Sequence, residues 1–124
     1  MNINRWMQAG VILLALAAFA IAADVTGTWT ATFDTQVGSQ SYTYVLKQEG
    51  KKLTGVAKSA FAKAETPITE GTVNGDDIFF VENLNYEGMP LRIVYKGKVS
   101  GDTIEFVRNV LEIADEKATA KRAK

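Results

Sequence analysis

Three short motifs, each with a glycine near its centre, divide the middle of the chain at an almost constant interval. Their glycines, Gly50, Gly75 and Gly101, are 25 and 26 residues apart and are flanked by polar residues with an apolar residue on either side. Asn-Gly is the strongest sequence signal for a two-residue β-hairpin turn, because a type I′ turn needs positive φ at both central residues, and Glu-Gly and Ser-Gly are weaker versions. We therefore predict three tight hairpins with their turns at 49–50, 74–75 and 100–101.

The segments between the turns alternate apolar and polar residues, as half-buried strands do. From Val25 to Asp34 the odd positions are Val, Gly, Trp, Ala and Phe, while the even positions are threonine or aspartate. This period of two is typical of a strand with one buried face, which would place Trp29 inside. Residues 42–48 resume the alternation, and 118–122 form a weaker last strand. The first strand, two strands for each of the three hairpins and the last strand together make eight.

If each turn has two residues, the hairpin register follows. Tyr44 would lie opposite Gly55, Gly71 opposite Ile78, and Gly97 opposite Ile104. Large residues would thus repeatedly meet small ones, as a narrow interior requires. The same register pairs Leu46 with Leu53, Tyr42 with Ala57, Thr69 with Phe80, Tyr95 with Phe106 and Ile93 with Arg108.

Closure of the sheet would remove its exposed edges. An even-numbered meander can close by pairing its last strand antiparallel to its first. We therefore predict an all-β, eight-stranded, antiparallel up-and-down β-barrel over residues 24–124, with an open and strongly rolled sheet as the alternative. At 124 residues the chain has room for one such domain.

The N-terminus has the pattern of a secretory signal peptide. Arg5 precedes an apolar run from Val11 to Ala20, and Ala20-Ile21-Ala22 resembles a cleavage site. We expect residues 1–23 to form a signal helix that is removed, which makes the protein secreted or periplasmic. The alternative is an uncleaved membrane anchor, for which the apolar run is short.

Charge and composition disfavour several classes of partner and activity. Without residues 1–23 the chain keeps 13 basic and 14 acidic side chains, a net charge of −1, which argues against nucleic acid or an anionic membrane as a partner. Histidine and cysteine are both absent, which removes the commonest general base, the commonest metal ligand and the lipid-bearing residue of a lipoprotein. We expect no enzyme, no metal and no cofactor.

The two ends of the predicted barrel differ. The tight turns share one end, so the other end would receive longer connections at 35–41, 59–66, 83–90 and 109–117, with a short helix at 110–118 over the opening. Ligands often bind at barrel mouths, on loops held by a rigid scaffold. The alternative is that apolar loop residues fold inward and plug the barrel, because an eight-stranded barrel is just wide enough either to be filled or to hold a small ligand.

Two charged residues fall on the inward face near this mouth. Glu82 and Arg108 each lie seven residues after a turn glycine, and buried ions are costly unless they are paired. They would form an ion pair, reach solvent, or anchor a polar ligand. Arginine would lower the pKa of the carboxyl group, and we expect no second inward carboxylate, so general acid catalysis is not predicted. The candidate ligand-binding residues are Tyr42, Tyr44, Phe80, Glu82, Tyr95, Phe106 and Arg108.

The chain resembles the lipocalin-like (calycin) barrels in Gly27-Thr28-Trp29 on the first strand, the hairpin meander, and Arg122 on a returning last strand. The resemblance implies that Trp29 packs against Arg122 or Lys121 and closes the barrel. The same first strand, with the later Gly-Lys-Val-Ser-Gly-Asp hairpin, is similar to a recurrent secreted bacterial domain of unassigned activity. The short length departs from true lipocalins, which favours a shallow cup over a deep cavity.

Two functions remain open from the sequence. The first is a secreted or periplasmic binding barrel that takes a small, partly apolar molecule or a carbohydrate at the mouth. The second is a module with a side-chain-filled barrel that docks on a protein or a polysaccharide through Phe61, Tyr86 and Met89 in the loops.

Overall fold

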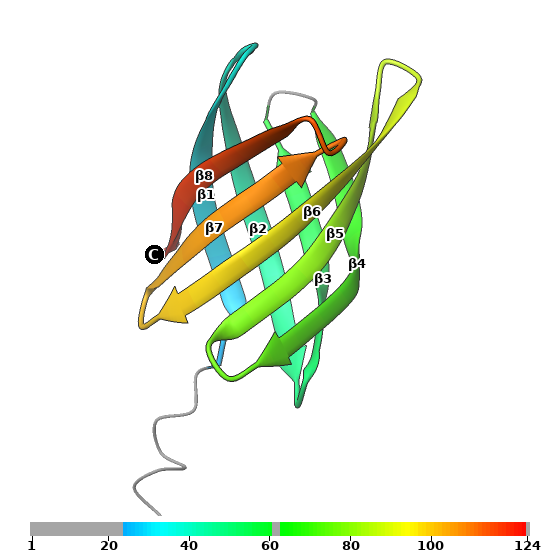
Figure 1. Ribbon diagram of the computed structural model, residues 1–124. Helices are drawn as coiled ribbons and strands as arrows, with labels where there is room; N and C mark the ends of the chain where they lie inside the picture. The colour runs from blue at the N-terminus through cyan, green and yellow to red at the C-terminus, as the bar shows by residue number, and fades with distance from the viewer. Residues whose placement is uncertain (1–23, 61–62, 124) are drawn as a thin grey trace, which may run out of the picture.

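The chain folds into a closed antiparallel barrel in which every strand pairs with its sequence neighbours and the last strand returns to the first (Figure 1). The structure, a computed structural model, describes residues 24–60 and 63–123. The predicted signal helix lies outside the described residues, and none of the described residues forms a helix long and apolar enough to cross a membrane. The strands are β1 (Gly27–Thr35), β2 (Gly38–Glu49), β3 (Lys52–Ser59), β4 (Ala64–Asn74), β5 (Asp77–Tyr86), β6 (Met89–Ser100), β7 (Thr103–Val110) and β8 (Ala114–Arg122).

The predicted eight-stranded, up-and-down barrel is therefore confirmed, and its architecture is compatible with a lipocalin-like fold. The seam between β1 and β8 is paired at Trp29↔Arg122 and Thr30↔Lys121. Arg122 lies over the Trp29 ring, with its guanidinium carbon 4.4 Å from the ring centroid. Toward the opposite end β1 and β8 diverge, each continuing into its own hairpin (Figure 1).

The three glycine turns exist, but their predicted register is wrong by one residue at each turn. The turn residues are 50–51, 75–76 and 101–102, and in each turn only the glycine has positive φ, near 60°. Positive φ at the first central residue is the type II′ pattern rather than type I′. Tyr44 consequently pairs with Ala57, and Gly97 with Phe106. Most side chains keep their predicted face, because moving a turn by one residue shifts the partner on the next strand by two, a full pleat repeat. The exception is in β4, where the register shifts between Thr69 and Thr72: Ile68 is buried, whereas Thr69, predicted to face inward opposite Phe80, is exposed and pairs with Val81.

The predicted long connections at the other end are mostly strand, so three of those four expectations are wrong. The chain turns at 36–37 and at 87–88 with two residues each, and at 111–113 with three. Glu87 and Gly88 both have positive φ, as a type I′ turn needs. The helix predicted at 110–118 is absent, because β8 already begins at Ala114. The β1–β2 and β5–β6 hairpins therefore extend past the barrel wall as paired strands (Figure 1).

Aromatic side chains fill the middle of the barrel. The Phe80 and Tyr95 rings stack with their centroids 4.5 Å apart, and the Tyr44 and Phe106 rings pack against them. All four side chains are inaccessible to solvent or nearly so. They form a plug across the middle of the barrel, below the end that carries the β1–β2, β5–β6 and β7–β8 turns.

Candidate functional site

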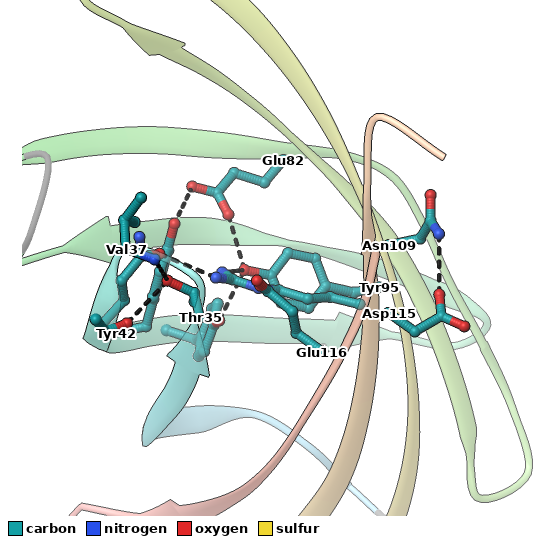
Figure 2. A network of polar contacts seen from close by, with 12 residues as sticks. Thr35, Val37, Tyr42, Glu82, Tyr95, Asn109, Asp115 and Glu116 are labelled. Atoms are coloured by element: carbon teal, nitrogen blue, oxygen red, sulfur yellow. Dashed lines mark hydrogen bonds and ion pairs between the residues drawn. The ribbon is translucent and has the colours of Figure 1, made fainter. Parts of the chain in front are cut away.

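A buried hydrogen-bond network lies directly on the aromatic plug, with the Tyr95 hydroxyl at its centre. This hydroxyl donates to Glu82 Oε1 over 2.8 Å and accepts from Tyr44 Oη at 2.8 Å and from Arg108 Nη1 at 3.1 Å. The Tyr42 hydroxyl donates to the other Glu82 oxygen over 3.2 Å. Figure 2 shows Glu82 reaching both Tyr42 and Tyr95. Tyr95 lies on the neighbouring strand β6, whereas Tyr42 comes from β2. One tyrosine oxygen thus connects a buried carboxyl group to a buried guanidinium.

Arg108 forms the upper layer of this network and is only 2% exposed. Its Nε donates to Glu116 Oε1 over 2.7 Å, and its Nη2 donates to Gln40 Oε1 over 3.0 Å. The guanidinium carbon lies 4.0 Å from the centroid of the Phe33 ring. β7 supplies the arginine and β8 the glutamate, at directly paired positions, so the ion pair is a cross-strand contact on the inward face.

Burial is the largest single influence on the pKa values of these groups. It raises the pKa of Glu82, against the hydrogen bond from Tyr95 and the charge of Arg108, which lower it. Burial also raises the pKa values of Tyr44 and Tyr95 well above the ordinary value, so both hydroxyl groups keep their protons and can donate. Burial alone would lower the pKa of Arg108, but the surrounding oxygens outweigh it and keep the guanidinium charged.

A pocket of about 250 Å³ opens above Arg108, between the β1–β2 and β7–β8 hairpins. Its floor carries Arg108, Glu116, Gln40 and Tyr42, together with Ser59, which is only 4% exposed. Its walls are apolar and come from five strands and two turns. The wall residues are Val37, Leu84, Tyr86, Leu91, Ile93, Val110, Leu111, Ile113 and Ala114, with Thr35 and Gln36 at the edge.

The structure divides the seven predicted ligand-binding residues into two layers. Tyr42 and Arg108 line the pocket. The other five are completely buried beneath it, as plug or as network, and do not reach the pocket. These five are Tyr44, Phe80, Glu82, Tyr95 and Phe106.

The residues predicted for a loop interaction surface are spread over the same end. Tyr86 lines the pocket from the last position of β5, and Met89 begins β6 with 56% of its surface exposed. Phe61 lies outside the described residues. Val37 and Ile113, at the tips of two other hairpins, are 67% and 79% exposed. The pocket entrance is therefore bordered by exposed apolar side chains.

Sequence reasoning missed three floor residues, Ser59, Gln40 and Glu116, and misjudged the partner of Arg108. Gln40 and Glu116 fall in segments predicted as loops, whereas both point inward from strands. Arg108 forms its ion pair with Glu116 and is joined to Glu82 through the Tyr95 hydroxyl. The expectations of no second inward carboxylate and of a lowered pKa for Glu82 are both wrong. The alternation of Ala114, Glu116 and Ala118 with polar outward residues was the sequence signal that could have identified Glu116 as inward-facing.

Among the described residues, every buried side-chain nitrogen and oxygen has a hydrogen-bond partner, and no group of three or more acidic, cysteine or histidine side chains is placed to hold a metal ion. A satisfied network of this kind holds its members rigidly, which presents a fixed polar floor to the pocket.

Comparison of the chain with protein-family models gives no match, and comparisons with curated proteins and with solved structures give no significant match either. The likeness to lipocalin-like barrels depends on the topology and on the Trp29–Arg122 contact alone.

Proposed function

We propose that this protein is an exported, non-catalytic binding barrel that takes a small, partly apolar ligand at its mouth. The observation that carries the proposal is the pocket of about 250 Å³, whose apolar walls stand over a charged and fully hydrogen-bonded floor. Such pockets, largely apolar with a few fixed polar groups, are the usual form of small-molecule sites. The volume is below the usual range for drug-sized ligands, so the ligand is small or protrudes.

The plug below the pocket supports binding near the surface. Because Tyr44, Phe80, Tyr95 and Phe106 are buried, a ligand would have to displace aromatic side chains to go deeper. The ligand-contacting residues of the proposal are therefore Tyr42 and Arg108 from the original set, joined by Gln40, Glu116 and the apolar walls. The five buried residues support the floor.

Export is proposed from the N-terminal pattern of residues 1–23 alone. Mass spectrometry under native conditions, on protein purified from its own host, tests export and binding together. The proposal expects a chain that begins at or near Asp24 and carries additional mass from a retained small molecule. A chain that retains residues 1–23 would contradict cleavage.

Binding is tested directly with N-phenylnaphthylamine, an uncharged fluorophore whose emission rises in apolar surroundings. Ala114 lines the pocket, so Ala114→Trp should fill it and abolish the rise in emission. Lys117, exposed on the outer face of the same strand, provides the matched control, and Lys117→Trp should behave like the wild type. Equal binding by the two variants, or no binding by the wild type, would contradict a ligand pocket.

A second candidate is an interaction module that docks on a protein or a polysaccharide through the same end. The exposed side chains of Val37, Met89 and Ile113 favour it. Met89 lies outside the pocket lining, so Met89→Asp should abolish capture of a partner while leaving N-phenylnaphthylamine binding unchanged. If the protein only binds small molecules, the wild type captures no partner, and Met89→Asp changes neither partner capture nor N-phenylnaphthylamine binding.

A further inference from the structure

We infer that the pocket selects uncharged amphiphiles and discriminates against carboxylates, because Glu116 already occupies the position on Arg108 that an acidic head group would take. The inference rests on the proposed function and names the chemical class of its ligand. An arginine at the floor of an apolar pocket ordinarily indicates an anionic ligand. Here the contacts of that arginine indicate the opposite.

The charges around the pocket are already balanced. Among the described residues, Arg108 and Glu116 are the only charged ones that line it, and they are 2.7 Å apart in an ion pair. Glu82 lies behind the floor and contributes no positive charge. A ligand carboxylate would add a negative charge beside Glu116 with no second cation to neutralise it, and like charges placed together at a desolvated contact are costly. An ammonium group would meet the same difficulty with Arg108.

The geometry of the guanidinium leads to the same conclusion. Bidentate carboxylate binding needs two adjacent N–H groups on one edge of the fork. Glu116 holds Nε, Tyr95 holds Nη1, Gln40 holds Nη2, and the Phe33 ring covers one face. The Nε edge is therefore occupied by Glu116, and each terminal nitrogen already has one acceptor. A ligand carboxylate that bound both N–H groups of the Nε edge would have to displace Glu116 and leave that carboxylate unpaired although its side chain is only 12% exposed.

A single neutral oxygen fits without displacing anything. A guanidinium carries more N–H groups than these contacts use, so Arg108 can still donate to a hydroxyl or carbonyl oxygen. An alkyl chain attached to that oxygen would run between Leu84, Leu91 and Ile93 and leave past Ile113. The volume of about 250 Å³ equals roughly eight times the share of one water molecule in the liquid, enough for a polar head and a short chain.

Three ligands of one chain length test the inference by isothermal titration calorimetry near neutral pH: octanol, octanoate and octylammonium. The wild type should bind octanol, and should bind each charged ligand about tenfold more weakly or worse. This comparison needs no variant and so does not depend on the folding of one. Octanoate or octylammonium binding as tightly as octanol would overturn the inference and leave the proposed function standing. Failure of all three to bind would count against the proposed function itself.

Glu116→Gln then tests the role of the internal carboxylate. Glutamine keeps the shape and the acceptor oxygen but removes the negative charge, so octanoate should gain about tenfold in affinity while octanol changes little. Asp115→Asn, on the outward face of the same strand, is the matched control and should leave both affinities unchanged. If octanoate stays weak in a folded Glu116→Gln protein, Glu116 does not determine the selectivity and the inference is wrong.

Discussion

The Tyr95 hydroxyl, on β6, lies 2.8 Å from Glu82 Oε1, on the neighbouring strand β5, and donates a hydrogen bond to that carboxyl group inside the barrel. The same oxygen accepts from Arg108 and from Tyr44, so its two lone pairs and its proton are all used. The Tyr95 hydroxyl group therefore joins Glu82, the acidic side of the buried network, to Arg108, its basic side.

Tyr95→Phe should be the most destabilising conservative change in the network. It leaves Arg108 with one unmatched N–H group and Glu82 with one donor fewer, and we expect a loss of about 3 kcal/mol in the free energy of unfolding. The loss can be measured by urea denaturation. Tyr44→Phe is the control, because the only contact of its hydroxyl that the structure records is with Tyr95, and it should cost about 1 kcal/mol. Equal losses of unfolding free energy in the two variants would show that Tyr95 does not connect Glu82 to Arg108.

Glu82→Gln should change how stability depends on pH. Burial raises the pKa of Glu82 above its ordinary value of 4.5, so the folded protein holds a proton on Glu82 that the unfolded chain releases. Stability must then fall as pH rises from about 4.5 through the raised pKa, since the folded state binds more protons in that range. Glutamine has no such proton. The wild type should therefore lose stability relative to Glu82→Gln over this interval, as thermal melts at a series of pH values would show. Parallel pH profiles would contradict a raised pKa.

Arg122→Ala should weaken the seam of the barrel. Arg122 covers Trp29, donates to the carbonyl oxygens of Thr26 and Asp24 at 2.9 and 2.7 Å, and forms an ion pair with Asp102. Its partial exposure limits the expected loss to about 1 to 2 kcal/mol. Arg122→Lys should recover only part of this, because an ammonium lacks the planar fork.

The neighbouring Lys121 provides the control for this measurement. It is exposed on the outer face of β8, so Lys121→Ala should change the free energy of unfolding by less than about 0.5 kcal/mol. If Lys121→Ala and Arg122→Ala cost the same, the closure of the barrel does not depend on the side chain over Trp29.

Gly97→Ala should be destabilising through crowding, although its backbone conformation is open to any residue. A Cβ atom there would lie 2.8 Å from Ile104 Cγ2, 2.9 Å from Ile78 Cγ1 and 3.0 Å from Phe106 Cδ1. Overpacking of this kind costs about 1 to 3 kcal/mol. Calorimetric unfolding would measure the loss. A stability equal to that of the wild type would mean that these side chains move aside without cost.

Part of the candidate site was predictable from sequence because side-chain direction in a strand depends only on parity. The alternation identified Tyr42, Glu82, Tyr95 and Arg108 as inward, and all four are buried in the barrel. The partners of Arg108 were not predictable in the same way. β8 turns alanines and one glutamate inward, since small residues face the bulky side chains of β7, as Ala118 faces Phe106. Because alanine contrasts weakly with its polar neighbours and Glu116 interrupts the inner face, the alternation along β8 is only a weak signal.

The sequence by itself determined the number of strands, the face of most strand residues and the presence of a tight turn at each of three glycines, because these depend on local alternation and on backbone φ. Tertiary structure decided the exact register, since a type II′ turn and a type I′ turn place the same glycine differently. It also decided that Glu116, rather than Glu82, is the ion-pair partner of Arg108, and that the aromatic plug stops below the mouth. Both outcomes depend on how strands distant in the sequence pack around a shared interior, which no local pattern records.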